Sequence, residues 1–271
     1  MALTDSLISW WSLDETSGTR ADSHGSNDLT DTNTVGYATG KQSNGGDFVR
    51  TSSEYLSHAS NSDLTTGDID WTIAYWVKFD VVNVYQAVVS KWNGAGEFWI
   101  GLSYEGKARF YAEKSSGYAD LYSTASLSAD TWYFITAWFD STNDLIYIQI
   151  NDATPESTAC TDIRTDTKNW LIGAASSGSG DQVDGVVDEV GFWKRLLTSD
   201  ERNQLYNSGN GVSYADLTSV TINAGVQVVA VNQPAATVSV AEVIIVLTAR
   251  SRSFGLNSGR AFGLTTVDRD G

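Results

Sequence analysis

Apolar and polar residues alternate with a period of two along several short stretches of the chain. This period places successive side chains on opposite faces of a β-strand, whereas a helix repeats at about 3.6 residues. Three stretches follow it, and the positions that share a face are Trp71, Ile73, Tyr75, Val77 and Phe79; Phe98, Ile100, Leu102 and Tyr104; and Trp132, Phe134, Thr136 and Trp138. We therefore predict strands with one face turned toward a core.

Turn-forming pairs of residues separate these stretches, at Asn93-Gly94, Glu105-Gly106, Ser116-Gly117 and Asn143-Asp144. Many short strands divided by such turns are typical of a β-sandwich. The composition agrees, because ten Trp, twelve Tyr and nine Phe accompany only two Pro and one Met. Aromatic residues suit a pleated, half-buried surface. We predict an all-β chain, long enough at 271 residues to bury a large core.

Residues 184–211, DGVVDEVGFWKRLLTSDERNQLYNSGNG, predict a strand followed by a short helix. Strict alternation along the strand would place Val186, Asp188, Val190 and Phe192 on one face and Val187, Glu189, Gly191 and Trp193 on the other. Thr198 is the expected N-cap of the helix, and Glu201 completes a capping box. The helix should carry Leu205 and Tyr206 inward and end near Gly209.

This strand and helix resemble the closing elements of the laminin-G-like, concanavalin A-like jelly-roll family. Four earlier segments resemble that family in the same order: Leu7–Leu29, which contains an Asp-Ser-x-Gly-x-Asn loop, and then Thr65–Phe79, Ser126–Asp140 and Leu145–Asp152. The resemblance implies a concanavalin A-like jelly-roll β-sandwich over residues 1–217.

The composition changes near Leu217, which predicts a second region over residues 218–271. All ten Trp lie at or before Trp193. Residues 1–219 carry 13 Lys and Arg against 30 Asp and Glu, whereas residues 220–271 carry 4 against 3. Val, Ile, Ala and Thr dominate Ser219–Ala249, so we expect a small β-rich extension. Its longest apolar run, Val243–Leu247, is far shorter than the roughly 20 residues of a membrane-spanning helix.

A short repeat follows, in which Phe254-Gly-Leu256 recurs as Phe262-Gly-Leu264. We interpret Phe254, Leu256, Phe262 and Leu264 as assembly residues; the alternative is a flexible terminus that happens to repeat. A region this small rarely folds alone, so we expect it to pack in a homo-oligomer or a larger assembly. Its Val- and Ala-rich pattern is similar to segments of phage virion proteins.

Charge and the N-terminus limit the partners and the location. A net charge of −16 disfavours nucleic acid and anionic membranes, because both repel an acidic surface. Cys160 is the single cysteine, so no disulfide forms within the chain. No signal peptide is recognisable before Leu7, because the first residues lack a basic and an apolar segment. These features favour a virion protein that reaches the outside on release.

We expect no enzymatic activity. Glycosidases on sandwich folds use two carboxylates on one face, often in a Glu-x-Asp-x-Glu strand, which this sequence lacks. Asp188 and Glu189 are adjacent and would point to opposite faces. Neither Gly-x-Ser-x-Gly nor His-Glu-x-x-His occurs.

The family resemblance implies a structural calcium ion held by Asp22 and Asn27 of the loop and by Asp188 of the closing strand. Calcium takes six to eight oxygen ligands, which carboxylates and backbone carbonyls supply. The alternative is an Asx-turn at Asp22 and a hydrogen-bonded Asp188 without an ion. His24 departs from the Gly or Asn that is usual in this loop.

The family resemblance also implies carbohydrate binding. The candidate residues are aromatic and lie beside predicted turns: Trp92 and Trp99 near Asn93–Gly96, and Tyr118 in the expected loop 115–123, with Tyr85 and Tyr122 in support. For any one ring the alternative is a place in the core.

We therefore expect a non-enzymatic phage virion surface protein, of the capsid decoration or fibre type. Its lectin-like head would engage a cell-surface glycan, and its C-terminal region would attach it to capsid or tail proteins. The alternative is a carbohydrate-binding module of a bacterial extracellular protein. The fold permits either function.

Overall fold

The structure, a computed structural model, describes residues 2–176 and 181–218 of the chain. These residues belong to one compact unit, Met1–Ser219. The predicted C-terminal region lies outside the described residues, apart from its first residue. None of the helices in the described ranges is long and apolar enough to cross a membrane.

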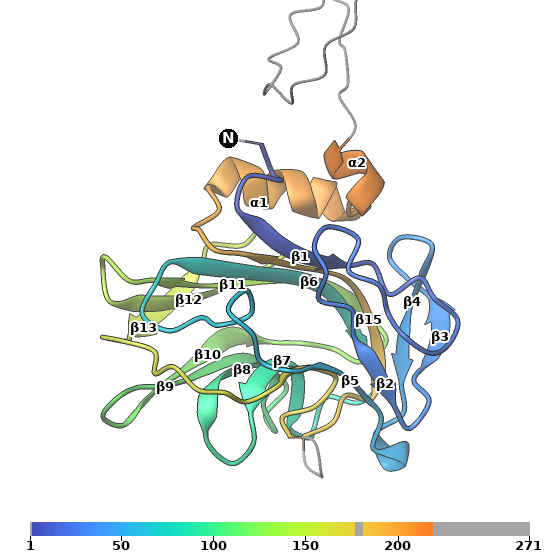
Figure 1. Ribbon diagram of the computed structural model, residues 1–271, viewed down its shortest axis with the longest axis horizontal. Coiled ribbons are helices and arrows are strands. Elements are labelled where there is room, and N and C mark those ends of the chain that lie inside the picture. The colour runs from blue at the N-terminus through green and yellow to red at the C-terminus, as the bar shows by residue number, and fades with distance from the viewer. Residues whose placement is uncertain (1, 177–180, 219–271) are drawn as a thin grey trace, which may run out of the picture. The chain divides into compact units, whose positions relative to one another are not determined.

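The described residues form two antiparallel sheets (Figure 1). The eight-stranded sheet contains β1 (Leu7–Trp11), β3 (Gly36–Thr39), β4 (Asn44–Phe48), β6 (Trp71–Phe79), β11 (Trp132–Asp140), β12 (Leu145–Ile150), β13 (Glu156–Ala159) and β15 (Gly185–Trp193). The seven-stranded sheet contains β2 (Thr30–Thr32), β5 (Tyr55–His58), β7 (Gln86–Trp92), β8 (Gly96–Leu102), β9 (Lys107–Glu113), β10 (Tyr118–Ser126) and β14 (Trp170–Ile172).

Strand order follows a jelly-roll rather than a simple meander. The larger sheet runs β13-β12-β11-β6-β15-β4-β3, with β1 also paired to β15, and the smaller runs β10-β9-β8-β7-β14-β5-β2. Neighbouring strands therefore come from distant parts of the sequence, as in the pairing of β6 with β15. The predicted all-β jelly-roll sandwich is confirmed.

The core lies between the two sheets and is built by the predicted alternation. Trp71, Ile73, Tyr75, Val77 and Phe79 of β6 all point into it, and each is at most 1% exposed. The Trp71 ring lies 5.0 Å from that of Phe98 on the opposite sheet, so aromatic contacts join the layers. Tyr104, predicted to continue β8, instead lies beyond its end and is exposed.

A second apolar cluster covers the outer side of the eight-stranded sheet. Figure 1 shows α1 (Ser199–Tyr206) and α2 (Tyr214–Thr218) on this side, away from the seven-stranded sheet. We call this cluster the covered face; its buried members are Leu3, Leu7, Trp10, Ala74, Trp76, Phe134, Trp193, Leu197 and Leu205. The capping box of Thr198 and Glu201 starts α1 as predicted, and Leu205 is buried beneath it.

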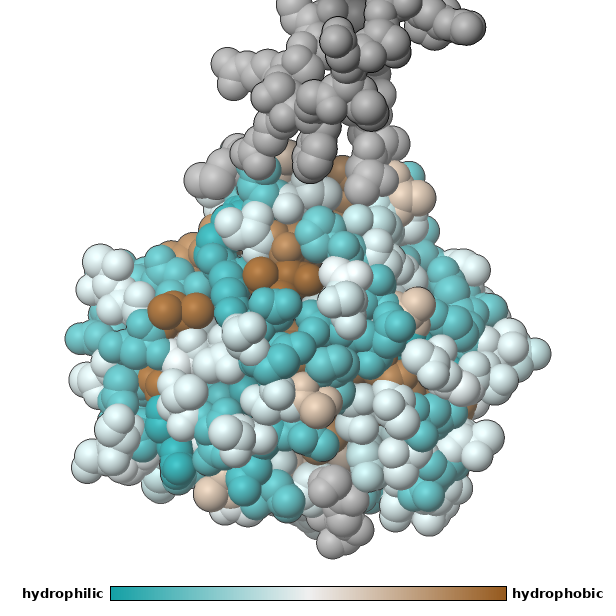
Figure 2. Space-filling view, in the orientation of Figure 1, coloured by the Kyte–Doolittle hydropathy of each residue, from teal (hydrophilic) through white to brown (hydrophobic). Residues whose placement is uncertain are grey.

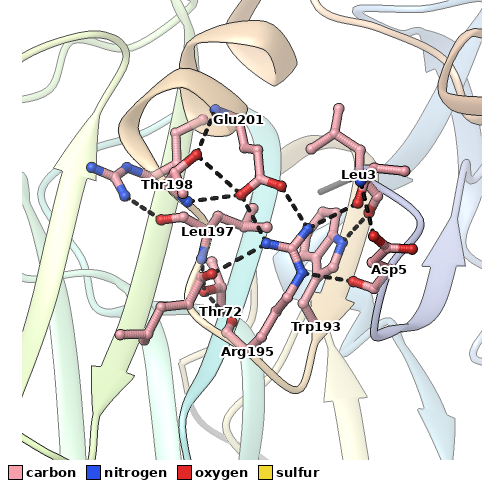
Figure 3. A network of polar contacts seen from close by, with 11 residues as sticks. Leu3, Asp5, Thr72, Trp193, Arg195, Leu197, Thr198 and Glu201 are labelled. Atoms are coloured by element: carbon pink, nitrogen blue, oxygen red, sulfur yellow. Dashed lines mark hydrogen bonds and ion pairs between the residues drawn. The ribbon is translucent and has the colours of Figure 1, made fainter.

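Arg195 fastens the covering elements to the sheet (Figure 3). Its guanidinium donates two hydrogen bonds to Glu201 of α1, at 2.8 and 2.9 Å. The same group donates to the carbonyl oxygens of Ala2 and Asp5 in the N-terminal segment. Trp193 adds an indole bond of 2.7 Å to the carbonyl of Leu3. One arginine therefore holds the N-terminus, β15 and α1 together.

The strict alternation predicted for β15 is wrong at its centre. The ladder with β6 advances from Asp188 opposite Trp76 to Gly191 opposite Ala74, so one extra residue is inserted. Glu189 adopts φ 49° at this β-bulge. Val187 faces the core before the bulge, and Val190 and Phe192 face it afterwards. After a bulge the alternate set of positions faces the core, and the apolar pattern alone does not predict where a bulge occurs.

Short 3-10 turns complete the described elements. η1 (Arg50–Ser52) precedes β5, and η2 (Asn207–Gly209) follows α1, which ends with Asn207 in the left-handed region. The helix therefore ends two to three residues before the predicted Gly209.

Candidate functional site

Seven aromatic side chains gather on the outer side of the seven-stranded sheet. We call this surface the aromatic face; its members are Tyr85, Trp92, Trp99, Tyr104, Tyr111, Tyr118 and Tyr122. Strand alternation creates it, because Ala108, Phe110 and Ala112 of β9 enter the core while the residues between them point outward.

The strand register brings the outward residues into rows. Trp99 of β8 lies opposite Tyr111 of β9, which lies opposite Asp120 of β10. One step along, Arg109 of β9 lies opposite Tyr122 of β10. Cross-strand neighbours of this kind have Cβ atoms close enough for their side chains to touch.

Arg109 is the centre of the aromatic face. Its guanidinium carbon lies 4.4 Å from the ring centre of Trp99, 5.1 Å from that of Tyr122, 5.2 Å from that of Tyr111 and 5.6 Å from that of Tyr85. Each distance is within the range of cation–π attraction. One cation therefore organises four rings from different strands and loops.

Asp120 fixes the orientation of that cation. Arg109 Nε and Nη2 donate to the two carboxylate oxygens at 2.6 and 2.8 Å, which forms a two-pronged ion pair. The Tyr122 hydroxyl donates to the same carboxylate at 2.9 Å. Burial, together with this hydrogen bond, raises the pKa of Tyr122 to about 12. The hydroxyl therefore stays protonated at neutral pH and remains a donor.

The remaining rings extend the surface outward. Tyr118 stacks on Tyr111 at 5.3 Å with 22° between the planes, and Trp92 meets Tyr111 edge-on at 5.1 Å. Tyr104 lies 6.4 Å from Tyr85. Tyr118 and Tyr104 are each 61% exposed, so their faces are available to a ligand. Figure 2 shows for comparison how hydrophilic most of the domain is on the face it displays.

Two hollows flank the rings. One, of about 350 Å³, is lined by Tyr85, Ser103, Glu105, Lys107 and Tyr122. The other, of about 160 Å³, is lined by Trp92, Asn93, Thr167, Lys168, Asn169 and Leu171. The larger hollow combines two aromatic side chains with hydroxyl and charged groups, whereas the smaller is mainly polar and has one ring, that of Trp92. A third hollow, lined by Tyr133, Ile148, Ile150 and neighbours, lies apart from these rings.

The structure brings the predicted carbohydrate residues Trp92, Trp99 and Tyr118 into this one face. Trp99 is only 5% exposed, so it forms the floor under Arg109, whereas Tyr118 presents its ring to solvent. Tyr118 and Tyr122 lie in strand β10 and not in the predicted loop. Sequence reasoning missed Arg109, Tyr111 and Asp120, although the alternation of residues 107–113 already places Arg109 and Tyr111 on the same outward face.

The predicted calcium ligands Asp22, Asn27 and Asp188 have different hydrogen-bond partners. Both oxygens of Asp22 accept backbone N–H groups, from Trp10, His24, Gly25 and Asn27, at 2.9 to 3.1 Å. The Asn27 side-chain oxygen accepts from Asn61 at 2.7 Å. Asp22 and Asn27 therefore meet in an Asx-type turn whose oxygens already have partners, and this geometry fits an ion poorly.

Asp188 lies elsewhere, with Oδ2 accepting from the amides of Lys41 and Gln42 at 2.6 and 2.8 Å. Its Oδ1 is buried and has no hydrogen-bond partner within the described residues. Burial raises the pKa of Asp188 to about 7, and burial beside Asp188 raises that of Glu189 to about 9. An orphaned oxygen next to a second carboxyl is the feature that suits a cation.

Within residues 2–176 and 181–218, no cluster of three or more His, Cys, Asp or Glu side chains is placed to hold a metal. Calcium stays a prediction, centred on Asp188. The predicted assembly residues Phe254, Leu256, Phe262 and Leu264 lie outside the described residues.

Residues 50–201 match the family described as the concanavalin A-like lectin/glucanases superfamily. Among solved structures, the chain is similar to the binding domain of paraclostridial mosquitocidal protein 1, with a TM-score of 0.64 and 16% identity over 76% of this chain and 53% of that one. It is also similar to domain 4 of AbnA, a GH43 extracellular arabinanase from Geobacillus stearothermophilus, solved with arabinotriose. That match has a TM-score of 0.59 and 16% identity over 73% of this chain and 97% of that one.

A third similar structure is the ligand-binding domain of botulinum neurotoxin serotype D in complex with N-acetylneuraminic acid. Its TM-score is 0.58 and its identity 14%, over 76% of this chain and 51% of that one. The chain therefore spans about half the length of both toxin domains. At these identities the likeness shows a shared fold. No curated protein sequence matches the chain.

Proposed function

The chain belongs to the concanavalin A-like lectin/glucanases superfamily, and on this premise we propose that its jelly-roll domain binds glycans through the aromatic face. Tyr85, Trp92, Tyr118 and Tyr122 would pack against the C–H surfaces of sugar rings. Ser103 and Lys107, in the larger hollow, would bond to sugar hydroxyls. The domain would act by binding and not by catalysis.

One observation carries the proposal: a half-buried cation, Arg109, contacts four rings of the face, of which Tyr85 and Tyr122 are exposed. Exposed aromatic groups normally lose side-chain freedom when a ligand binds, which weakens binding. Here Arg109 and Asp120 already restrain the rings before a ligand arrives. Preorganisation of this kind has no evident value for stability at a solvent-exposed surface, but it favours recognition.

The similar structures support a binding role. Two of them are binding domains of toxins, one solved with N-acetylneuraminic acid, and the third is domain 4 of an arabinanase, solved with arabinotriose. If the domain were a glycosidase, it would need two carboxylates that are free to act on one sugar. Asp120, the carboxylate at the centre of the face, is instead bound to Arg109 and Tyr122.

A glycan array followed by calorimetric titration of the best ligand tests the proposal. We expect Tyr118→Ala to weaken binding about tenfold, which corresponds to about 1.4 kcal/mol. Tyr37→Ala is the matched control, because Tyr37 is 54% exposed on β3 of the other sheet. Equal affinities of both variants and the wild type would contradict the proposal, as would an array on which the wild type binds no glycan.

The wider role we propose is that of a phage virion surface protein, with this domain as the exposed head and residues 218–271 as the part that assembles on capsid or tail proteins. The change in composition near Leu217 supports it. The alternative is a module of a bacterial extracellular protein. Light scattering compares the full chain with a chain that ends at Ser219. An oligomer that becomes a folded monomer supports attachment through the C-terminal region, whereas two monomers favour the alternative.

A further inference from the structure

The charged side chains among the rings of the aromatic face indicate which class of glycan it binds. We infer that the face selects uncharged sugars, and that Asp120 is the specificity-determining residue because it neutralises Arg109, the cation that contacts four of the rings. This inference rests on the proposed glycan binding and adds the chemical class of the ligand.

The Arg109 guanidinium could bind a carboxylate, but its Nε–Nη2 edge is already paired with Asp120. A guanidinium binds a carboxylate through two parallel N–H groups, and Arg109 uses Nε and Nη2 in this way for Asp120. The Arg109 and Asp120 side chains are only 13% and 20% exposed. An acidic sugar would therefore have to displace a shielded carboxylate from this edge or approach a guanidinium whose charge Asp120 already balances, while a neutral sugar needs only the rings.

The other cations near the larger hollow are also balanced by acids. Lys107 Nζ lies 3.6 Å from Glu105, and both groups line the hollow. Arg50 donates to the carbonyl oxygen of Tyr85 at 3.2 Å, and its charge acts on half-buried Asp181. Burial raises the pKa of Asp181, which Arg50 and Arg109 oppose.

Around the larger hollow, three cations, Arg50, Lys107 and Arg109, thus stand against three carboxylates, Glu105, Asp120 and Asp181. Lys168 belongs to the smaller hollow, beside Trp92. A sugar carboxylate would be a fourth negative charge without a partner, and it would approach a strongly acidic domain. An unpaired charge in a shielded site binds poorly, because neither water nor a counter-charge compensates it.

Replacing Asp120 by Asn keeps the shape of the side chain and removes the charge. Arg109 would then remain between Trp99, Tyr111, Tyr85 and Tyr122 with an uncompensated positive charge. Such a cation favours the ionised form of a nearby carboxylate and offers it a fork of donors. The variant should therefore gain affinity for acidic sugars.

The experiment titrates the full chain with N-acetylneuraminic acid and with its methyl ester, in which a methyl group replaces the carboxylate charge. For the wild type we expect the acid to bind at least about tenfold more weakly than the ester. For Asp120→Asn we expect the acid to bind at least about tenfold more tightly than it binds the wild type.

Glu105→Gln is the matched control, because it removes one negative charge from the same hollow and leaves Arg109 paired. Glu105 is exposed, so we expect its loss to improve binding of the acid by about threefold or less. Circular dichroism checks that each variant is folded. The wild-type comparison of acid and ester needs no variant, so it tests the inference even if Asp120→Asn fails to fold.

Two results overturn the inference: a wild type that binds the acid as tightly as the ester, or an Asp120→Asn variant that gains no more than Glu105→Gln. An array on which the wild type binds no glycan overturns the proposed function instead. If Asp120→Asn binds the acid and the wild type binds neither probe, the role of Asp120 is supported, and the array decides which neutral sugar binds.

Discussion

The outer faces of the two sheets carry similar aromatic side chains but have different neighbours. On the covered face, Trp10, Trp76 and Trp193 are at most 2% exposed, because α1 and the N-terminal segment lie over them. On the aromatic face none of the described elements overlies Tyr118 or Tyr104, and both are 61% exposed. Residue type alone therefore does not distinguish a structural ring from a binding ring. What distinguishes them is whether the chain supplies its own cover.

Each face also has an arginine at its centre, and the two arginines do different work. Arg195 joins the N-terminal segment, through the carbonyls of Ala2 and Asp5, to Glu201 of α1, so it closes the covered face. Arg109 pairs with Asp120 on a neighbouring strand and places its charge among rings, so it arranges side chains and leaves them open. The comparison predicts large stability effects on the covered face and large binding effects on the aromatic face.

The largest expected effect is that of Trp193→Ala. The side chain is fully buried, packs edge-on against Trp10 at 5.9 Å and bonds to the carbonyl of Leu3. Removing a buried Trp typically costs about 3–5 kcal/mol of the free energy of unfolding. Urea denaturation followed by circular dichroism measures it. A loss below about 1 kcal/mol would mean that the packing of α1 and the N-terminal segment on the covered face contributes little to stability.

Arg195→Met should cause the next largest loss of stability, because it should loosen the packing of α1 and the N-terminal segment on the sheet. Glu201 would be left 8% exposed without its ion-pair partner, and hydrogen bonds to charged groups contribute about 1.5–3 kcal/mol each when lost. We expect a loss of about 2 kcal/mol and faster hydrogen exchange in α1. Arg195→Lys is the control, because it keeps the charge without the fork and should lose less. Unchanged exchange in α1 would refute the role given to Arg195.

Acidification from pH 8 to pH 6 should stabilise the domain when EDTA is present. The raised pKa values of Asp188, about 7, and Glu189, about 9, mean that the folded state holds protons that the unfolded state has released. The free energy of unfolding therefore falls as pH rises between the ordinary carboxyl pKa and these values, by on the order of 1 kcal/mol or more. Thermal melts at both pH values measure the change.

The same thermal melts, with variants and with added calcium, show where the pH dependence arises and test whether calcium binds. Glu189 accepts the indole N–H of Trp10, so the change belongs to the covered face, and Asp188→Asn should reduce it. If calcium binds at Asp188, it competes with the proton, and adding it should raise the melting temperature more at pH 8 than at pH 6. Melting temperatures that rise from pH 6 to pH 8 in EDTA would show that the sign is wrong.

The smallest expected stability effect is that of Tyr118→Ala, the variant expected to weaken glycan binding. Its ring is mostly exposed and makes one stacking contact, with Tyr111. Exposed substitutions usually change the free energy of unfolding by about 0.5 kcal/mol or less. Urea denaturation should therefore match the wild type. A loss as large as that of Trp193→Ala would place Tyr118 in the structural group and remove the distinction between the faces.

The sequence predicts those features that depend on neighbouring positions. Alternation over Trp71–Phe79 identifies a core strand, and the spacing of Thr198 and Glu201 identifies a capped helix; the structure confirms both. The bulge at Glu189 is missed, because an inserted residue leaves the residue types unchanged. Tyr118 is misplaced in a loop, because Gly117 and the serines before it suggest a longer turn than the one that forms.

The centre of the candidate site depends on the register between strands, which no local pattern contains. Arg109 meets Trp99 and Tyr122 only because β9 pairs with β8 on one side and β10 on the other. Trp92, Trp99 and Tyr118 are identifiable as candidates from residue type, but which rings are covered is decided by where α1 packs. The packing of α1 over one sheet is a tertiary feature, which a local sequence pattern does not predict.

The most direct test of the account follows the indole N–H signals of the tryptophans by NMR while the tightest neutral glycan from the array is added. The account predicts that Trp92 and Trp99, beside the aromatic face, shift with the titration, and that Trp76 and Trp193, beneath α1, keep their positions. Shifts confined to Trp76 and Trp193 would contradict it, because the ligand would then bind at the covered face.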